Sequence, residues 1–260
     1  MTAVASGAPV RARVGDFYTW MSAAFVATAF LGFIPTYFEP MAQGKFQANP
    51  VVHLHGVAFF GWTLFALVQT SLVPAGKTAL HRSVGLIGVS YATLLTVLGL
   101  LAALNSLNTA TVMGFGAQGE AFLIVPLLVI VTFAVLFTAA IANIRRPEVH
   151  KRLMLLATVS VLNAPVARPM LTWVLHADMP GGQPPVWINA PVSWLSYGFI
   201  LIAMAHDWKT RGRPHAVYVI ALPVLAFLAW AVIPVSETVA WHSFARDFLA
   251  LAGKPPAAPA

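Results

Sequence analysis

The chain has 260 residues, of which 59% are hydrophobic and only 9% are charged, and its mean hydropathy is +0.79. A soluble domain has roughly 25% charged residues, so this composition excludes a water-soluble globular protein and indicates a bilayer protein. The absence of cysteine excludes disulfides, thiolate metal sites and iron–sulfur clusters, while basic cytoplasmic loops explain the net charge of +7 without nucleic acid as a partner.

Seven apolar runs are each long enough to cross a hydrocarbon core of about 30 Å as a helix. Unpaired backbone groups are too costly in lipid, so the spans must be helices. We therefore predict an all-α integral membrane protein, a bundle of seven transmembrane helices in one domain. The runs are 17–38, 51–73, 82–105, 121–143, 152–176, 186–206 and 215–236. The tail 237–260 ends in proline and alanine, and we expect it to be disordered.

The distribution of cations predicts the orientation of the helices. Eleven of the fifteen Lys and Arg residues lie on alternate loops or at the N-terminus, and the positive-inside rule places these segments in the cytoplasm. The other face has only Lys45, Arg246 and Lys254, and Arg168 lies inside the fifth run. We predict a cytoplasmic N-terminus and a periplasmic C-terminus in the bacterial inner membrane, with membrane lipids as partners.

Four histidines lie at the predicted cytoplasmic interface, namely His81, His150, His206 and His215. Three of them, His81, His150 and His215, lie at the start of a helix directly after a basic turn. This pattern suggests a weak internal repeat, in which one N-terminal helix is followed by three helical hairpins. Two interpretations remain open: a metal, haem or proton-relay site, or contact with lipid phosphates. We favour the lipids, because cations at a helix N-terminus oppose the helix dipole and call for an anion nearby.

His53, His55 and His176 lie at the opposite face with Glu120, and methionines lie nearby in the sequence. Imidazole, thioether and carboxylate without thiol suit copper, and neutral imidazole also binds zinc or iron. A single haem between His55 and His176 is a further alternative. Because His53 and His55 are about 200° apart around a helix, only one should face the bundle, and we expect His55. Interfacial histidines without a metal are the competing interpretation.

Arg168 lies about 12 Å inside the membrane, counted from the outer end of the fifth run at the helical rise. A charge at such depth normally faces the bundle interior or a water-filled cavity and has a partner. One interpretation is a clamp for an anion or a substrate carboxylate, with Asn163 and Trp62 nearby. The other is a structural ion pair with Glu120. Two prolines bracket Arg168, so we expect a kinked helix with an outward cavity or a buried pair.

Two short segments resemble a known signature. Residues 81–85 read His-Arg-Ser-Val-Gly, and residues 150–158 read His-Lys-Arg-Leu-Met-Leu-Leu-Ala-Thr. Both are similar to the His-Arg-x-x-Gly signature of uncharacterised bacterial multi-pass membrane proteins, some of which are linked to the assembly of haem–copper oxidases. The resemblance spans about residues 50–160. It implies that the histidines bind a metal or haem and that a respiratory complex is a partner.

Three hypotheses about function follow. The first is a metal- or haem-binding membrane protein with a redox or metal-handling role, in which His53 or His55 binds copper, zinc, iron or one haem near the outer face together with His176 and, as an optional ligand, Glu120. The second is a metal-free binder or carrier of a small amphipathic or anionic molecule around Arg168. The third is an accessory subunit without chemistry of its own. No pattern in the sequence assigns a catalytic residue, and the seventh run has no lysine to hold retinal.

Overall fold

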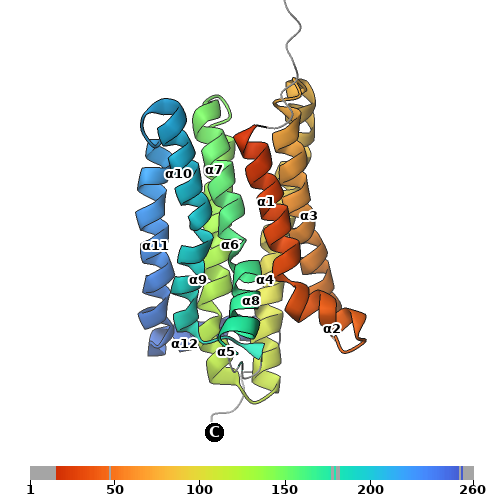
Figure 1. The fold of residues 1–260 in the computed structure, drawn as a ribbon. Helices are drawn as coiled ribbons and strands as arrows, with labels where there is room; N and C mark the ends of the chain where they lie inside the picture. The colour runs from red at the N-terminus through yellow and green to blue at the C-terminus, as the bar shows by residue number, and fades with distance from the viewer. Residues whose placement is uncertain (1–15, 47, 177–178, 180–181, 252, 254–260) are drawn as a thin grey trace, which may run out of the picture.

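The computed structural model describes residues 16–46, 48–176, 179, 182–251 and 253. Its regular elements are all helical, and they lie side by side in one bundle (Figure 1). Seven helical stretches in the described residues are long and apolar enough to cross a membrane. They are Phe17–Ala42, Pro50–Leu72, Thr78–Val112, Gly116–Ala142, Pro147–Val174, Val186–Arg211 and Ala216–Ser236. The predicted seven-helix, all-α membrane fold is thereby confirmed.

The two ends of the bundle differ in their connections. The turns at 73–77, 143–146 and 212–215 all lie at one end, at the top of Figure 1. We call this end the basic rim, because these turns contain four of the cations. The opposite rim holds three short helices, α2 (Glu39–Ala42), α5 (Gly116–Phe122) and α12 (Val239–Ala250) (Figure 1). His53 and His55, near the start of the second span, and His176, just after the end of the fifth span, belong to this opposite rim.

Three spans are single unbroken helices, and a fourth is divided only at Leu123 near its start. Asn49 caps the second span, because its Oδ1 accepts a hydrogen bond of 3.0 Å from the backbone N–H of Val51, and Pro50 follows in the first turn. The third helix continues past the expected end at residue 105 and terminates before Gly114, which has a left-handed φ of 85°. The elements are α3 (Pro50–Leu72), α4 (Thr78–Val112), α5 (Gly116–Phe122) with α6 (Ile124–Ala142), and α11 (Ala216–Ser236).

The first, fifth and sixth spans are interrupted. The fifth breaks at residues 161–162 and becomes π-helical after Pro169, as the prolines around Arg168 predicted, because a proline nitrogen cannot donate to the helix. The sixth breaks at Tyr197. The elements are α1 (Phe17–Gly32), η1 (Ile34–Phe38) and α2 (Glu39–Ala42); α7 (Pro147–Ser160), α8 (Asn163–Pro169) and η2 (Met170–Val174); and η4 (Val186–Ile188), α9 (Asn189–Ser196) and α10 (Gly198–Arg211).

A close approach between α1 and α8 sets the position of the fifth span. A Cβ atom added at Gly32 would lie 2.1 Å from the carbonyl oxygen of Pro165, so only glycine allows this contact. The contact places the next residue, Phe33, beside Arg168: the Arg168 Cζ lies 5.8 Å from the centre of the Phe33 ring.

The expectation of a disordered tail is wrong for residues 239–250, which form the helix α12 (Val239–Ala250). The side chain of Thr238 caps this helix by accepting from the Trp241 N–H at 3.2 Å. Ala245 and Leu249 are one turn apart on its buried face and pack in one cluster with Leu107 of α4. The proline-rich ending of the tail predicted disorder. The apolar spacing within residues 239–250 nevertheless allows one face of this segment to be buried, so that it forms a helix. Residues 252 and 254–260 lie outside the described residues.

Candidate functional site

The four predicted metal ligands do not form one group. The His53 Nδ1 lies 2.9 Å from the Tyr37 hydroxyl and bonds with it, and His176 is an exposed residue with a left-handed φ of 44°. Nowhere in the described residues do three or more His, Asp or Glu side chains gather closely enough to hold a metal ion. The metal site therefore stays a prediction without geometric support.

Glu120 fastens α12 to the bundle. Its Oε2 accepts from Arg246 at 3.0 Å and lies 2.7 Å from the His242 Nδ1, while its backbone carbonyl accepts from the Trp241 indole at 2.7 Å. The expected ion pair of Glu120 with Arg168 is thus wrong. The physical reason is that α12, expected to be disordered, supplies a nearer cation.

His55 meets the expectation that it turns partly inward. Its ring lies 4.2 Å from that of Phe59, and its Nδ1 is buried with no hydrogen-bond partner among the described residues. His55 thus has a buried ring nitrogen without a partner among the described residues.

Arg168 is half-buried and lacks an anionic partner within the described part of the chain. Its guanidinium lies over the Phe33 ring, but none of its five N–H donors makes a hydrogen bond there. Six residues separate it from the end of the span at Val174, which corresponds to about 9 Å of helix. The site is therefore a cation in the membrane, stabilised by an aromatic face and by no counter-charge from the described residues.

The other two predicted ligand-binding residues lie elsewhere. Trp62 is 0% exposed and packs against Phe65, Phe133 and Phe137, so it is a core residue. Asn163 donates from its Nδ2 to the Ser193 hydroxyl at 2.8 Å and lines a small cavity whose walls do not include Arg168. The structure thus does not bring these residues together around Arg168, and the cavity at Asn163 is not the expected outward opening.

A buried ion cluster at the basic rim escaped the sequence reasoning. Arg152 is 1% exposed, and its guanidinium makes two hydrogen bonds to the carboxylate of Asp207, one of them a 2.8 Å bond from Nε to Oδ2. Its Nη1 also donates to Glu148 Oε2 at 2.7 Å. The sequence did contain a signal, because Asp207 directly follows the predicted run 186–206 and is the only acidic residue in the span Val186–Arg211.

The histidines after the basic turns share one structural role. The Nδ1 of His81 lies 3.1 Å from the Gln69 carbonyl, and that of His150 lies 2.9 Å from the Ala140 carbonyl. The backbone N–H of His215 donates to Asp207 at 3.1 Å. Each histidine thereby ties the start of a helix to the end of the preceding one. Contact of these histidines with lipid phosphates stays a prediction.

The chain matches no family model, no curated protein and no solved structure at a significant level. The resemblance of residues 81–85 and 150–158 to the His-Arg-x-x-Gly membrane proteins therefore remains a prediction.

Proposed function

We propose that the protein binds an anionic amphipathic molecule within the membrane and holds its charged group at Arg168. The observation that supports this most is the half-buried guanidinium, which has no carboxylate or hydrogen-bond acceptor among the described residues. Intramembrane charges are costly and normally face a partner. A carboxylate or phosphate would supply one, because a guanidinium binds both with two parallel hydrogen bonds.

The surroundings suit a molecule with an apolar part. Trp173 and Val174 follow on the same span and are exposed on the surface of the bundle, where lipid would surround them. The apolar part of a ligand could lie along them while its anionic end reaches Arg168. His55, with its free Nδ1, is a second polar group at the anionic end. We infer that the ligand approaches from the bilayer, because these exposed apolar side chains follow Arg168 on the same span.

Under the predicted orientation this site lies near the periplasmic surface of a bacterial inner membrane. The charge bias of the turns supports that orientation. The protein would then bind its ligand from the outer leaflet.

Haem is a second candidate, and the buried Nδ1 of His55, which has no partner among the described residues, favours it. A haem has two propionates that suit an arginine, and its iron takes an imidazole as axial ligand. This candidate keeps the redox role that the sequence predicted, and it agrees with the resemblance to proteins linked to oxidase assembly. His176, exposed in this conformation, would remain the predicted second ligand.

Native mass spectrometry of the protein purified in a neutral detergent tests the proposal. We expect an anionic adduct on the wild-type protein, its loss in Arg168→Gln, and its retention in Arg168→Lys. Arg246→Gln is the control for loss of a cation elsewhere, since Arg246 bonds to Glu120. An adduct that survives equally in Arg168→Gln would contradict the proposal.

The same preparation separates the two candidates. A Soret band that disappears in His55→Ala would support haem. An adduct without absorption in the visible range would support the metal-free binder. When no adduct is retained, dodecanoate is added as a probe, with dodecyltrimethylammonium as its cationic counterpart. Equal binding of the two would remove the role of Arg168.

A further inference from the structure

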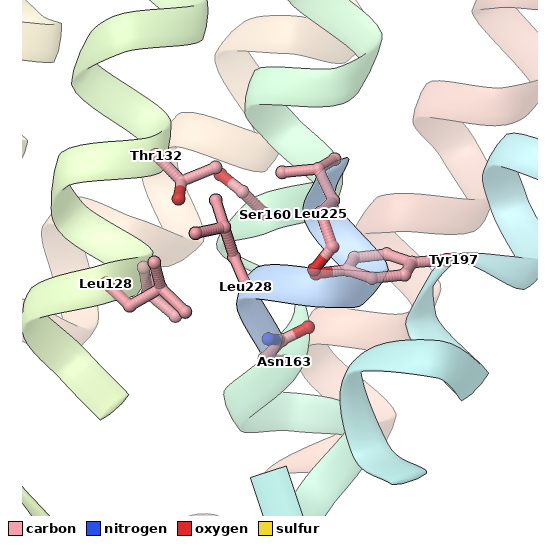
Figure 2. Close-up of a pocket in the computed structure, with 8 residues that line it drawn as sticks. Leu128, Thr132, Ser160, Asn163, Tyr197, Leu225 and Leu228 are labelled. Carbon is pink, nitrogen blue, oxygen red and sulfur yellow. The ribbon is translucent and has the colours of Figure 1, made fainter. Parts of the chain in front are cut away.

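The breaks of the fifth and sixth spans meet at one cavity inside the bundle. Ser160 ends α7 and Asn163 begins α8, while Tyr197 stands between α9 and α10. Figure 2 shows these three side chains around one space, together with Thr132 of α6. The cavity has a volume of about 10 Å³, which is close to what a single water molecule needs.

Three of the four polar residues that line this cavity use a hydrogen elsewhere. The Asn163 Nδ2 donates to Ser193 at 2.8 Å, the Ser160 hydroxyl donates to the Ala157 carbonyl at 2.7 Å, and the Tyr197 hydroxyl donates to the Leu225 carbonyl at 3.3 Å. These bonds leave the Asn163 Oδ1 and the Ser160 and Tyr197 hydroxyl oxygens as acceptors, whereas the Thr132 hydroxyl can still donate. The occupant must therefore donate a hydrogen bond to the Asn163 Oδ1.

The side-chain oxygen of Asn163 has the strongest need for such a donor. The residue is 9% exposed, and its Oδ1 is buried with no hydrogen-bond partner in the described part of the chain. A buried acceptor without a partner costs about 1–3 kcal/mol. Ordered water commonly satisfies such groups, and it also does so where membrane helices are interrupted.

The lining decides between water and a cation. The remaining walls are apolar and include Leu128, Leu225 and Leu228, and the lining has no acidic side chain. A sodium or ammonium ion would be buried there without a counter-charge, which is expensive. Water needs no counter-charge, and the Thr132 hydroxyl can donate to its oxygen.

We propose that this cavity is a binding site for one buried water molecule, which donates to the Oδ1 of Asn163 and joins the two helix breaks in the middle of the bundle. The proposal is independent of the ligand at Arg168, because none of the cavity residues belongs to that site.

The test is an experimental structure at about 2 Å resolution or better, determined once in sodium chloride and once in choline chloride. We expect a peak about 2.7–3.2 Å from the Asn163 Oδ1 in both salts. An empty cavity would overturn the proposal. So would a peak that appears only with sodium, since it would identify a cation.

Two variants test whether Asn163 holds the water molecule. Asn163→Leu should lose the peak, because the larger apolar side chain fills the cavity and removes the acceptor. Asn189→Leu is the matched control: Asn189 is also a buried asparagine, but it donates to the Ala229 carbonyl at 2.9 Å and does not line the cavity. A full peak in Asn163→Leu, or its loss in a folded Asn189→Leu, would contradict the assignment. If Asn163→Leu fails to fold, the wild-type structures still decide.

Discussion

Arg152 and Arg168 lie in the same span and are in opposite electrostatic situations. Arg152 is fully buried and bonded to Asp207 and Glu148, whereas Arg168 has only an aromatic face. Removing one member of a buried ion pair leaves an uncompensated charge and costs about 3–5 kcal/mol. Removing a charge that has no partner carries no such penalty. The two arginines should therefore respond to mutation with opposite signs.

Asp207→Asn is expected to lower the free energy of unfolding by about 3 kcal/mol, because the buried Arg152 then keeps only the half-exposed carboxylate of Glu148 as its counter-charge. Arg168→Met should leave the stability of the ligand-free protein unchanged or raise it. Thermal unfolding in detergent measures both effects, with the exposed Asp247→Asn as a control that should not shift. An unchanged Asp207→Asn protein would show that the buried pair does not contribute.

His215 should make stability depend on pH. Its burial lowers the pKa of the imidazole below the ordinary value of 6.5, and the charges of Arg152 and Arg211 lower the pKa further. The neutral Nδ1 accepts from the Val217 N–H at 3.1 Å and caps α11. As the pH falls below about 6.5, the unfolded chain takes up a proton that the folded chain resists, so the free energy of unfolding decreases.

His215→Asn should flatten this dependence, because asparagine also caps helices but does not titrate in this range. Melting temperatures between pH 7.5 and pH 5 for the two proteins provide the comparison. Parallel curves would show that another group is responsible.

At the scale of elements, close packing and tethers position the rims. The contact of Gly32 with Pro165 joins α1 to the broken fifth span, and Glu120 joins α12 to α5. Neither contact follows from helix propensity. Both depend on residues that are far apart in the sequence.

Gly32→Ala is expected to destabilise the protein by about 1–3 kcal/mol, because the added methyl group would overlap the Pro165 carbonyl, which cannot rotate away. It should also weaken ligand retention at Arg168 through displacement of Phe33. Gly85→Ala is the matched control, since a Cβ there meets no atom within 4 Å. Unfolding of the two variants in detergent should therefore differ, and equal stability would contradict the close approach.

Glu120→Gln should loosen α12 without unfolding the bundle. The variant loses the charge that holds Arg246 and His242, so amide exchange over residues 239–250 should accelerate. Glu237→Gln changes an exposed carboxylate near the same helix and should leave the exchange rates alone. Unchanged exchange in Glu120→Gln would mean that the apolar face of α12 suffices to hold it.

At the scale of the whole molecule, the seven spans separate a basic rim from an opposite rim that has few cations. Positive loops resist translocation, so this asymmetry predicts which rim stays in the cytoplasm.

The chain has no cysteine, so single cysteines report the orientation cleanly. In intact bacterial cells, an impermeant maleimide should label Gln43→Cys at the opposite rim. It should label Ala75→Cys at the basic rim only after the membrane is permeabilised. Both positions are exposed, and neither substitution removes a cation. The reverse labelling pattern would overturn the predicted orientation.

The sequence by itself determined the number, nature and approximate limits of the spans, because the cost of placing unpaired backbone in lipid leaves no alternative to long apolar helices. It also predicted the distortion of the fifth helix, because a proline disrupts the helical hydrogen bonds at its own position. The sequence also marked Arg168 as unusual, because its position inside an apolar span already implies a cost of desolvating the charge.

Only the tertiary structure decided which polar groups meet. Glu120 bonds to Arg246 rather than Arg168, Arg152 to Asp207, and Asn163 turns toward a cavity, because each partner comes from a distant helix whose rotation the sequence pattern leaves open. Apolar residues surround most of these helices, so the hydrophobic period does not reveal which face turns inward. Close packing between spans fixes that rotation, and with it the candidate site.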